Sequence, residues 1–146
     1  MSGTLTFGCR AAEHAYTQRR AGYAVVIGEN RKVAAILGSR TQFWLPGGGC
    51  EPGESYEDAI SREVREELGR PIRLLRHIGQ VVQYFYAAGE KQHYEMEAMF
   101  FLAEFAEGSV VPCEYELHWL PADEWDRGFF HECHAWAARQ VLPGAH

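Results

Sequence analysis

The sequence predicts an α/β (α+β) domain in which a mixed β-sheet packs against two helices. Short apolar segments bounded by Gly, Pro and Asn recur along the 146 residues, which is typical of strands. One segment changes to helical spacing, and a second such segment lies near the end of the chain. No internal repeat or linker divides the sequence, so we expect residues 1–146 to form a single domain around one core.

Composition is that of an ordinary globular protein. The chain is 47% hydrophobic and 23% charged, and no apolar run approaches the roughly 20 residues that a membrane-spanning helix needs. The N-terminal segment lacks the apolar core of a signal peptide. We therefore expect a soluble, cytoplasmic protein with no membrane partner.

Net charge argues against one class of binding partner, and the cysteine pattern argues against disulfides and a zinc site. A formal net charge of −6 argues against contact with a long nucleic acid, because proteins that make such contacts normally present a basic face. An acidic chain can still handle phosphates if divalent cations supply positive charge locally. The four cysteines form no CxxC pair, so we expect free thiols rather than a disulfide framework or a zinc site.

The first predicted elements are two buried strands at 22–28 and 32–37. The three residues between them, 29–31, fit a hairpin turn in which Gly28 and Asn30 tolerate unusual dihedral angles. The sequence thus predicts that these two strands pair with each other.

A third short strand is expected at 42–45, where Pro46 stops it, and three glycines follow at 47–49. This glycine run fits neither an ordinary strand nor a helix, and glycine allows the backbone to approach a ligand closely. We therefore expect a ligand-facing loop, followed by a helix whose N-terminus offers further donors to phosphate oxygens.

Residues 55–68 predict the most regular helix of the chain. Ser55 is a natural N-cap and Gly69 a natural C-terminal stop. Apolar residues repeat along the segment with helical spacing, and they are Tyr56, Ala59, Ile60, Val64 and Leu68.

Three carboxylates of this helix share one side. Glu63, Glu66 and Glu67 stand at i, i+3 and i+4, an arc of roughly 100°. The simplest interpretation is a solvated acidic face. However, apolar positions one or two turns earlier project into the same sector, and the outward side is taken by Asp58, Ser61 and Arg65. Three inward carboxylates repel one another unless cations bind there, and oxygen donors alone favour Mg²⁺ or Mn²⁺ over zinc.

Further strands and a last helix follow. The expected order is strand pieces within 72–86, a loop at 90–93, strands at 94–104 and 117–120, and a helix at 132–142 that Pro143 and Gly144 end. This mixture of strands and two helices is the basis for the predicted mixed sheet.

Aromatic residues near and beyond the glycines are candidates for holding a nucleotide base. Tyr84, Tyr86 and Tyr94 are better candidates than the phenylalanines, because their hydroxyls tolerate a wet cleft, and Trp44 adjoins the glycines. The alternative is that this aromatic stripe belongs to the core.

The pair His131 and His134 invites a metal-site interpretation, because the two could share a helix face. No second ligand pair has matching spacing. We therefore expect solvent-facing or core-edge positions for both histidines.

The segment from Gly48 to Gly69 resembles the Nudix box. In that pattern, Gly, five residues and Glu are followed by seven residues, Arg-Glu, an aliphatic residue, any residue, Glu-Glu, any residue, Gly and an aliphatic residue. Every fixed position matches except the last, where Arg70 stands. We expect Ile72 to supply the missing packing. A looser similarity extends over most of the chain.

The resemblance implies an α/β/α sandwich around a mixed sheet. It also implies that Glu63, Glu66 and Glu67 bind divalent metal, with the carbonyl of Gly48 as an additional ligand. Arg62 would hold these carboxylates through charge-assisted hydrogen bonds.

The resemblance further implies a reaction. In this family, water generally attacks a phosphorus of a nucleoside diphosphate-linked substrate and releases a nucleoside monophosphate with pyrophosphate or a second phosphorylated product. The general base is expected within the box, at Glu66 or Glu67, or downstream at Glu116, with Glu114 next. The alternative for the downstream pair is exposed strand-edge charge. Glu54 would be a supporting acid.

We expect the substrate to be an ordinary or oxidised dNTP, with nucleotide sugars, ADP-ribose, dinucleoside polyphosphates and capped RNA ends as alternatives. A homodimer is a further possibility. The alternative function is a non-catalytic Nudix-fold module that binds nucleotide, although none of the helix carboxylates is substituted. A structure in which Glu63 and Glu67 turn away from 47–49 would contradict the catalytic assignment.

Overall fold

A computed structural model of the chain describes residues 4–38 and 41–141. A long five-stranded sheet has the order β1-β6-β7-β2-β5, and a three-stranded sheet has the order β4-β3-β8. The strands are β1 (Thr6–Phe7), β2 (Tyr16–Val26), β3 (Val33–Leu37), β4 (Phe43–Trp44), β5 (Gly47–Gly49), β6 (Ile72–Ala87), β7 (Gln92–Phe105) and β8 (Leu117–Leu120).

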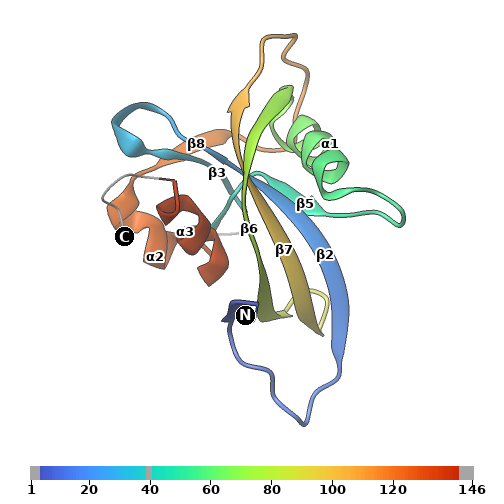
Figure 1. Cartoon of the computed structure of the whole chain (residues 1–146). Helices are drawn as coiled ribbons and strands as arrows, with labels where there is room; N and C mark the ends of the chain where they lie inside the picture. Colours follow the sequence, from blue (N-terminus) through green and yellow to red (C-terminus); the bar gives the residue numbers. More distant parts are fainter. Residues whose placement is uncertain (1–3, 39–40, 142–146) are drawn as a thin grey trace.

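Three α-helices cover the long sheet from two sides. They are α1 (Tyr56–Leu68), α2 (Trp125–Gly128) and α3 (Glu132–Arg139). Figure 1 shows α1 on one side of the sheet and α2 and α3 on the other. Because β2 pairs in parallel with β7 and antiparallel with β5, the sheet is mixed. The predicted α/β/α sandwich around a mixed sheet is confirmed.

Strand β2 explains why the fold has a core on each face of the sheet. Successive side chains of a strand point to opposite faces. Ala21, Tyr23 and Val25 accordingly belong to the core cluster that includes residues of α3. Ala24 and Val26 belong to the other cluster, which α1 completes.

The expected hairpin between 22–28 and 32–37 is wrong beyond its turn. β2 and β3 lie in different sheets. The two segments are joined next to the turn by the bridge Ile27–Val33 and by the hydrogen bond from the N–H of Gly28 to the carbonyl of Lys32. Asn30 has a positive φ of 56°, as expected, but Gly28 is extended. A Cβ on Gly28 would lie 2.6 Å from the ring of Trp119, so this glycine makes room for packing rather than for a turn.

The glycine run is a short strand and not the loop that the sequence predicted. β5 pairs antiparallel with β2 over Gly47 to Gly49. Gly47 has φ +139°, and a Cβ there would lie 2.1 Å from the carbonyl oxygen of Gly22. Glycine therefore allows two backbones to approach each other closely, which is a different use of its small size from the one expected.

Helix α1 matches its prediction. The Ser55 hydroxyl accepts a hydrogen bond from the N–H of Asp58 at 3.1 Å, and Gly69 closes the helix in the left-handed conformation. The predicted outward residues Asp58, Ser61 and Arg65 are exposed.

The later elements differ from prediction mainly in length. β6 is one strand with irregular register rather than separate pieces, and β7 begins at Gln92, inside the expected 90–93 loop. β8 has the predicted bounds. Helix α3 ends at Arg139, and the predicted stop at 143–144 lies outside the described residues. The sequence did not predict β1 or α2.

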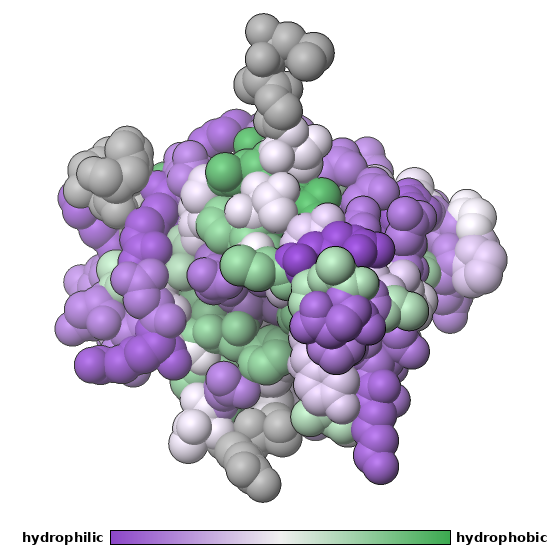
Figure 2. All heavy atoms as spheres, turned by 90° about the horizontal axis from the view of Figure 1, so that it is seen from below, coloured by the Kyte–Doolittle hydropathy of each residue, from purple (hydrophilic) through white to green (hydrophobic). Residues whose placement is uncertain are grey.

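The helices, the cysteines and the surface can each be compared with the expectations from composition. Across residues 4–38 and 41–141, no helix is long and apolar enough to cross a membrane. All four cysteines are free, as expected. Figure 2, which views the molecule from below, shows hydrophilic side chains around a smaller central region of hydrophobic ones.

Candidate active site

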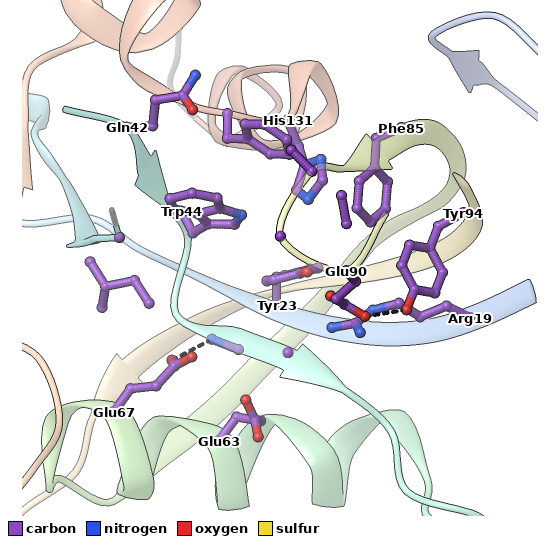
Figure 3. Close-up of a pocket in the computed structure, with 18 of the residues that line it drawn as sticks. Arg19, Tyr23, Gln42, Trp44, Glu63, Glu67, Phe85, Glu90, Tyr94 and His131 are labelled. Carbon is purple, nitrogen blue, oxygen red and sulfur yellow. Dashed lines mark hydrogen bonds between the residues drawn. The ribbon is translucent and has the colours of Figure 1, made fainter. Parts of the chain in front are cut away.

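Two carboxylates of α1 face the glycine strand. The N–H of Gly47 donates a hydrogen bond to Oε1 of Glu67 at 2.9 Å, and this glutamate is only 7% exposed. A Cβ on Gly48 would lie 2.2 Å from Oε2 of Glu63. Figure 3 shows both side chains directed from α1 toward β5. The predicted inward orientation of these two residues is confirmed, and the solvated interpretation is wrong for them.

Arg62 ties the surrounding acids together. Its Nε and Nη2 donate to the two carboxylate oxygens of Glu54, each at 2.9 Å. Its Nη1 donates to Glu63 at 2.7 Å and to Glu66 at 3.2 Å. The hydrogen bonds from Arg62 lower the pKa of Glu54 to about 2. Arg62 therefore has the positioning contacts that the resemblance implied.

We call this group the carboxylate corner, and it consists of Gly47, Gly48, Gly49, Glu54, Arg62, Glu63, Glu66 and Glu67. Burial raises the pKa of Glu67 to about 9, against the opposing hydrogen bond from Gly47. Burial also raises the pKa of Glu63, although Arg62 opposes the shift. When Glu63 and Glu67 are ionised, the inner end of the corner therefore carries more negative charge than Arg62 neutralises.

The donor set of the corner fits a hard divalent cation. Mg²⁺ and Mn²⁺ prefer oxygen ligands such as carboxylates and backbone carbonyls. The corner offers both kinds of oxygen, and too little positive charge lies near its buried carboxylates to neutralise them. In the part of the chain that the structure describes, no three His, Cys, Asp or Glu side chains already converge as a metal site. Glu66 in particular is 47% exposed in its side chain and is turned to Arg62.

A cavity of about 860 Å³ opens beside the carboxylate corner (Figure 3). Glu63, Glu67, Gly47 and Gly48 form one part of its lining. Opposite them lies a group we call the aromatic wall, which consists of Trp44, Phe85, Tyr94, Phe130 and His131. The carboxylates and a largely aromatic space therefore share one cavity, as a nucleotide site requires.

The predicted aromatic residues divide into two groups. Trp44, Tyr86 and Tyr94 line the cavity. Tyr84 is not among its lining residues and instead packs edge-on against Tyr16, with ring centroids 5.5 Å apart. Its neighbour Phe85 lines the cavity instead, together with Tyr86 near the end of β6.

Two stacked pairs of flat rings lie in the aromatic wall. Trp44 stacks on Phe130 with an interplanar angle of 26°, and Phe85 stacks on Tyr94 with an angle of 24°. The Tyr94 hydroxyl donates to Glu90 at 2.5 Å, which holds the hairpin tip beside the cavity. Such faces suit a planar base.

Sequence reasoning missed several lining residues: Arg19, Phe85, Glu90, Phe130 and His131. They come from β2, the β6–β7 hairpin and the segment before α3, so only tertiary structure brings them together. The sequence feature that could have pointed to them was the high content of aromatic residues after the box.

Glu114 and Glu116, the predicted acids downstream of the box, follow a segment that contacts the C-terminal end of α1. The N–H of Glu114 donates to the carbonyl of Glu66 at 3.1 Å, and the N–H of Tyr115 donates to that of Glu67 at 2.9 Å. Both Glu114 and Glu116 are exposed. The backbone thus ties Glu114 to the helix, and no interaction among the described residues does so for Glu116.

The two histidines are not solvent-facing. His131 is 4% exposed and His134 is fully buried. Burial lowers the pKa of His131 to about 3 and that of His134 well below its usual value. Both rings are therefore neutral near pH 7. The solvent-facing alternative is wrong; His131 lies at the edge of the core, where it lines the cavity, and His134 lies inside the core.

Comparison with known proteins gives matches over most of the chain. A family model described as the NUDIX domain matches residues 17–143. Among solved structures, a MutT Nudix hydrolase from Burkholderia pseudomallei is 26% identical, with TM-score 0.60 over 86% of this chain and 99% of that one. A Nudix hydrolase from Nitrosomonas europaea shares the fold at 19% identity, with TM-score 0.62 over 89% of this chain and 92% of that one.

Curated relatives match over shorter stretches. Nucleoside triphosphatase NudI of Klebsiella pneumoniae is 49% identical over 47 residues, which are 32% of this chain and 33% of the relative. A putative 8-oxo-dGTP diphosphatase of Bacillus subtilis is 37% identical over 65 residues, 44% of this chain and 42% of that protein. The chain thus spans about a third to two fifths of the length of these relatives.

Proposed function

The chain belongs to the Nudix family, and from that premise we propose that it is a metal-dependent hydrolase that cleaves a phosphoanhydride bond in a nucleoside diphosphate-linked substrate. The proposed substrate is a (d)NTP or an oxidised dNTP, cleaved to a nucleoside monophosphate and pyrophosphate. The names of the relatives, a nucleoside triphosphatase and a putative 8-oxo-dGTP diphosphatase, support this class of substrate.

One observation carries the proposal. Glu67, anchored by the N–H of Gly47, and Glu63, packed against Gly48, enter the same cavity as the aromatic wall. A nucleotide whose base lies among the rings can therefore place its phosphates at the carboxylate corner. Neither a solvated acidic helix nor a plain aromatic core provides this juxtaposition.

The corner is proposed to hold Mg²⁺ or Mn²⁺ through Glu63, Glu66 and Glu67, with the carbonyl of Gly48 as an additional ligand. A bound divalent cation would neutralise phosphate charge and acidify water. Arg62 keeps the acids apart and oriented, since it binds Glu54 through two hydrogen bonds and reaches Glu63 and Glu66 with a third nitrogen. Glu54 fixes Arg62 in turn.

Proton removal from the attacking water is proposed to fall to a helix carboxylate. Glu67 is enclosed and already accepts from Gly47, whereas Glu66 lies at the exposed edge of the corner, where water reaches it. We therefore favour Glu66 over Glu67 as the general base. Glu114 and Glu116 are the alternatives outside the helix.

Other expectations remain proposals. We propose that residues 1–146 act as one domain, in the cytoplasm, on small-molecule substrates and not on long nucleic acids. A homodimer is a proposal that light scattering on the purified chain would test.

The test is a hydrolysis panel of dGTP, 8-oxo-dGTP, dATP, dCTP, dTTP, UDP-glucose, ADP-ribose and diadenosine tetraphosphate with Mg²⁺ or Mn²⁺. Glu67→Gln is expected to lower turnover by roughly 10²- to 10³-fold, the scale of losing a positioned electrostatic group. Glu57→Gln, on the exposed side of the same helix, is the matched control and should retain activity.

Two results would oppose the proposal. Equal activity in Glu67→Gln and Glu57→Gln would remove the carboxylate corner from the reaction. No turnover of any substrate, with nucleotide binding intact, would favour the alternative of a non-catalytic nucleotide-binding module.

A further inference from the structure

Two buried histidines outside the carboxylate corner carry unpaired nitrogens. The rings of His131 and His134 lie with their centroids 5.0 Å apart. Nδ1 of His131 and Nε2 of His134 are buried and have no hydrogen-bond partner. A buried unpaired polar atom costs about 1–3 kcal/mol, so a pair of them on neighbouring rings requires an explanation.

The backbone fixes the protonation of His134. The N–H of Leu45 donates to its Nδ1 at 3.0 Å, and a nitrogen that accepts a hydrogen bond carries no proton. A neutral imidazole has one N–H, so the proton of His134 lies on Nε2. That atom is therefore a donor. The rings of Tyr23, Phe100 and Phe129 surround the imidazole, and no acceptor among the described residues lies within hydrogen-bond distance of Nε2.

His131 provides the complementary acceptor. Its Nδ1 is the unpaired buried nitrogen of the adjacent ring, whose centroid lies 5.0 Å from that of His134. A hydrogen bond between the two nitrogens requires a side-chain movement or a bridging water. When Nδ1 accepts, the proton of His131 lies on Nε2. Because Nδ1 is enclosed, Nε2 is the nitrogen that remains for the part of the ring that lines the cavity.

The surroundings of His131 suit contact with a base. The ring of Trp44 lies at 87° to that of His131 with centroids 6.5 Å apart, and the ring of Phe85 lies at 71° with centroids 4.6 Å apart. A planar base that stacks on the ring of Trp44 or on that of Phe85 can bring the polar atoms at the edge of the base within reach of the His131 imidazole. Figure 3 shows His131 between the labelled Trp44 and Phe85, above the space that Glu63 and Glu67 enter from the opposite side.

We propose that His131 is a specificity-determining residue whose Nε2–H donates to a carbonyl oxygen of the base, and that His134 is a positioning residue that sets this tautomer. The inference rests on the proposed function, since it places the base in this cavity. A fixed donor favours guanine and thymine, which present an oxygen where adenine and cytosine present an amino group. The chemical class is therefore a nucleotide whose base has an oxo group at C6 of a purine or at C4 of a pyrimidine, which we call the oxo member of each purine or pyrimidine pair.

The first test measures binding without metal or turnover. Calorimetric titrations compare dGMP with dAMP and dTMP with dCMP, for the wild type and for His131→Phe, which keeps a ring but removes both nitrogens. The wild type should bind the oxo member of each pair about tenfold more tightly. In His131→Phe both ratios should fall to within about twofold.

A merely structural role for His131 predicts a different pattern, because loss of packing would weaken all four nucleotides alike and leave the ratios unchanged. That result would overturn the proposal, as would equal binding of the four by the wild type or no binding of any.

The second test reads the tautomer directly. Long-range ¹H–¹⁵N NMR of the wild-type protein at pH 7 should show both histidines protonated on Nε2. In His134→Phe, if it folds, His131 should lose this single tautomer. A wild-type His131 protonated on Nδ1 would overturn the proposal whether or not the variant folds. Neither test involves hydrolysis, so a failure of the proposed activity would be recognised separately.

Discussion

The carboxylate corner and the histidines beside the aromatic wall handle buried polarity in opposite ways. In the corner Arg62 forms ion pairs with Glu54, Glu63 and Glu66, whereas the buried Glu67 has a raised pKa and is left for a cation to compensate. Around His131 and His134 no residue in the described part of the chain forms an ion pair, and burial keeps both rings neutral. Both regions meet at one cavity, where Figure 3 shows Glu63 and Glu67 opposite His131.

This difference indicates a division of labour within the proposed site. Charged, paired groups suit a place where phosphate and metal charge must be balanced. Neutral, directional donors and flat rings suit a place where a base must be distinguished from similar bases. Changes to the corner should therefore alter the rate of reaction, and changes to the histidines should alter selectivity and acid stability.

The largest expected effect breaks the compensated charge. Arg62→Ala removes the one cation that Glu54 and Glu63 share, so the acids repel one another and lose their orientation. Turnover of the best substrate in the panel should fall by roughly 10²- to 10³-fold, the scale of losing a positioned electrostatic group. Steady-state kinetics measures it.

Arg65→Ala is the matched control, because Arg65 lies on the exposed side of the same helix and should leave kinetics nearly unchanged. Comparable losses in the two variants would show that α1 itself, rather than its charge pattern, is needed.

A second prediction concerns acid stability and separates the two regions. The folded-state pKa of His131 is about 3, below its ordinary value of 6.5, so the unfolded chain takes up the proton first as pH falls. The stabilisation is complete above pH 6.5 and is lost between there and about pH 3. The slope should be about 1.4 kcal/mol per pH unit for each buried histidine, as measured by urea unfolding from pH 7 to pH 4.5.

His131→Phe should lower this slope by about 1.4 kcal/mol per pH unit, because one buried histidine is removed. Glu67, whose pKa is raised to about 9, contributes a slope of opposite sign over this range, and it does so equally in both proteins. An unchanged slope in the variant would mean that other groups cause the acid sensitivity.

The smallest expected effect concerns the start of α1. Ser55→Ala removes the hydroxyl that accepts from the N–H of Asp58, at a cost of about 1 kcal/mol in the free energy of unfolding. Ser61→Ala, an exposed position inside the same helix, should not destabilise the protein. Thermal melts compare the two, and equal melting temperatures would contradict the capping role.

The carboxylate corner could be predicted from the sequence because most of it is local. Glu63, Glu66 and Glu67 lie within one helix, where a fixed rotation per residue sets which side each occupies, and Ser55 and Gly69 mark its ends. Even so, the sequence did not show that 47–49 pairs with β2 as a strand, because that requires the close approach of Gly47 to Gly22.

The aromatic wall could be predicted only in part, because its members come from distant segments. Trp44, Tyr86 and Tyr94 were predicted, but Tyr84 does not line the cavity and Phe85 does. The sequence does not give the strand register or the place where β6 turns into the hairpin, and these decide which side chains reach the cavity. His131 was missed because its burial depends on α3 packing against the sheet. The pairing of β3 with β8 rather than β2 is a further non-local choice that hydrophobic pattern alone does not decide.

The most direct test of the central claim is Mn²⁺ binding measured by electron paramagnetic resonance. The comparison is between the wild type, Glu63→Gln/Glu67→Gln, and Glu57→Gln/Asp58→Asn, which neutralises two exposed carboxylates of the same helix. The wild type and the exposed-face variant should remove free Mn²⁺ signal equally, and the inner-face variant should not, while all three melt cooperatively. Equal Mn²⁺ binding by the inner-face variant and the wild type would contradict the assignment of the carboxylate corner as the metal-holding centre.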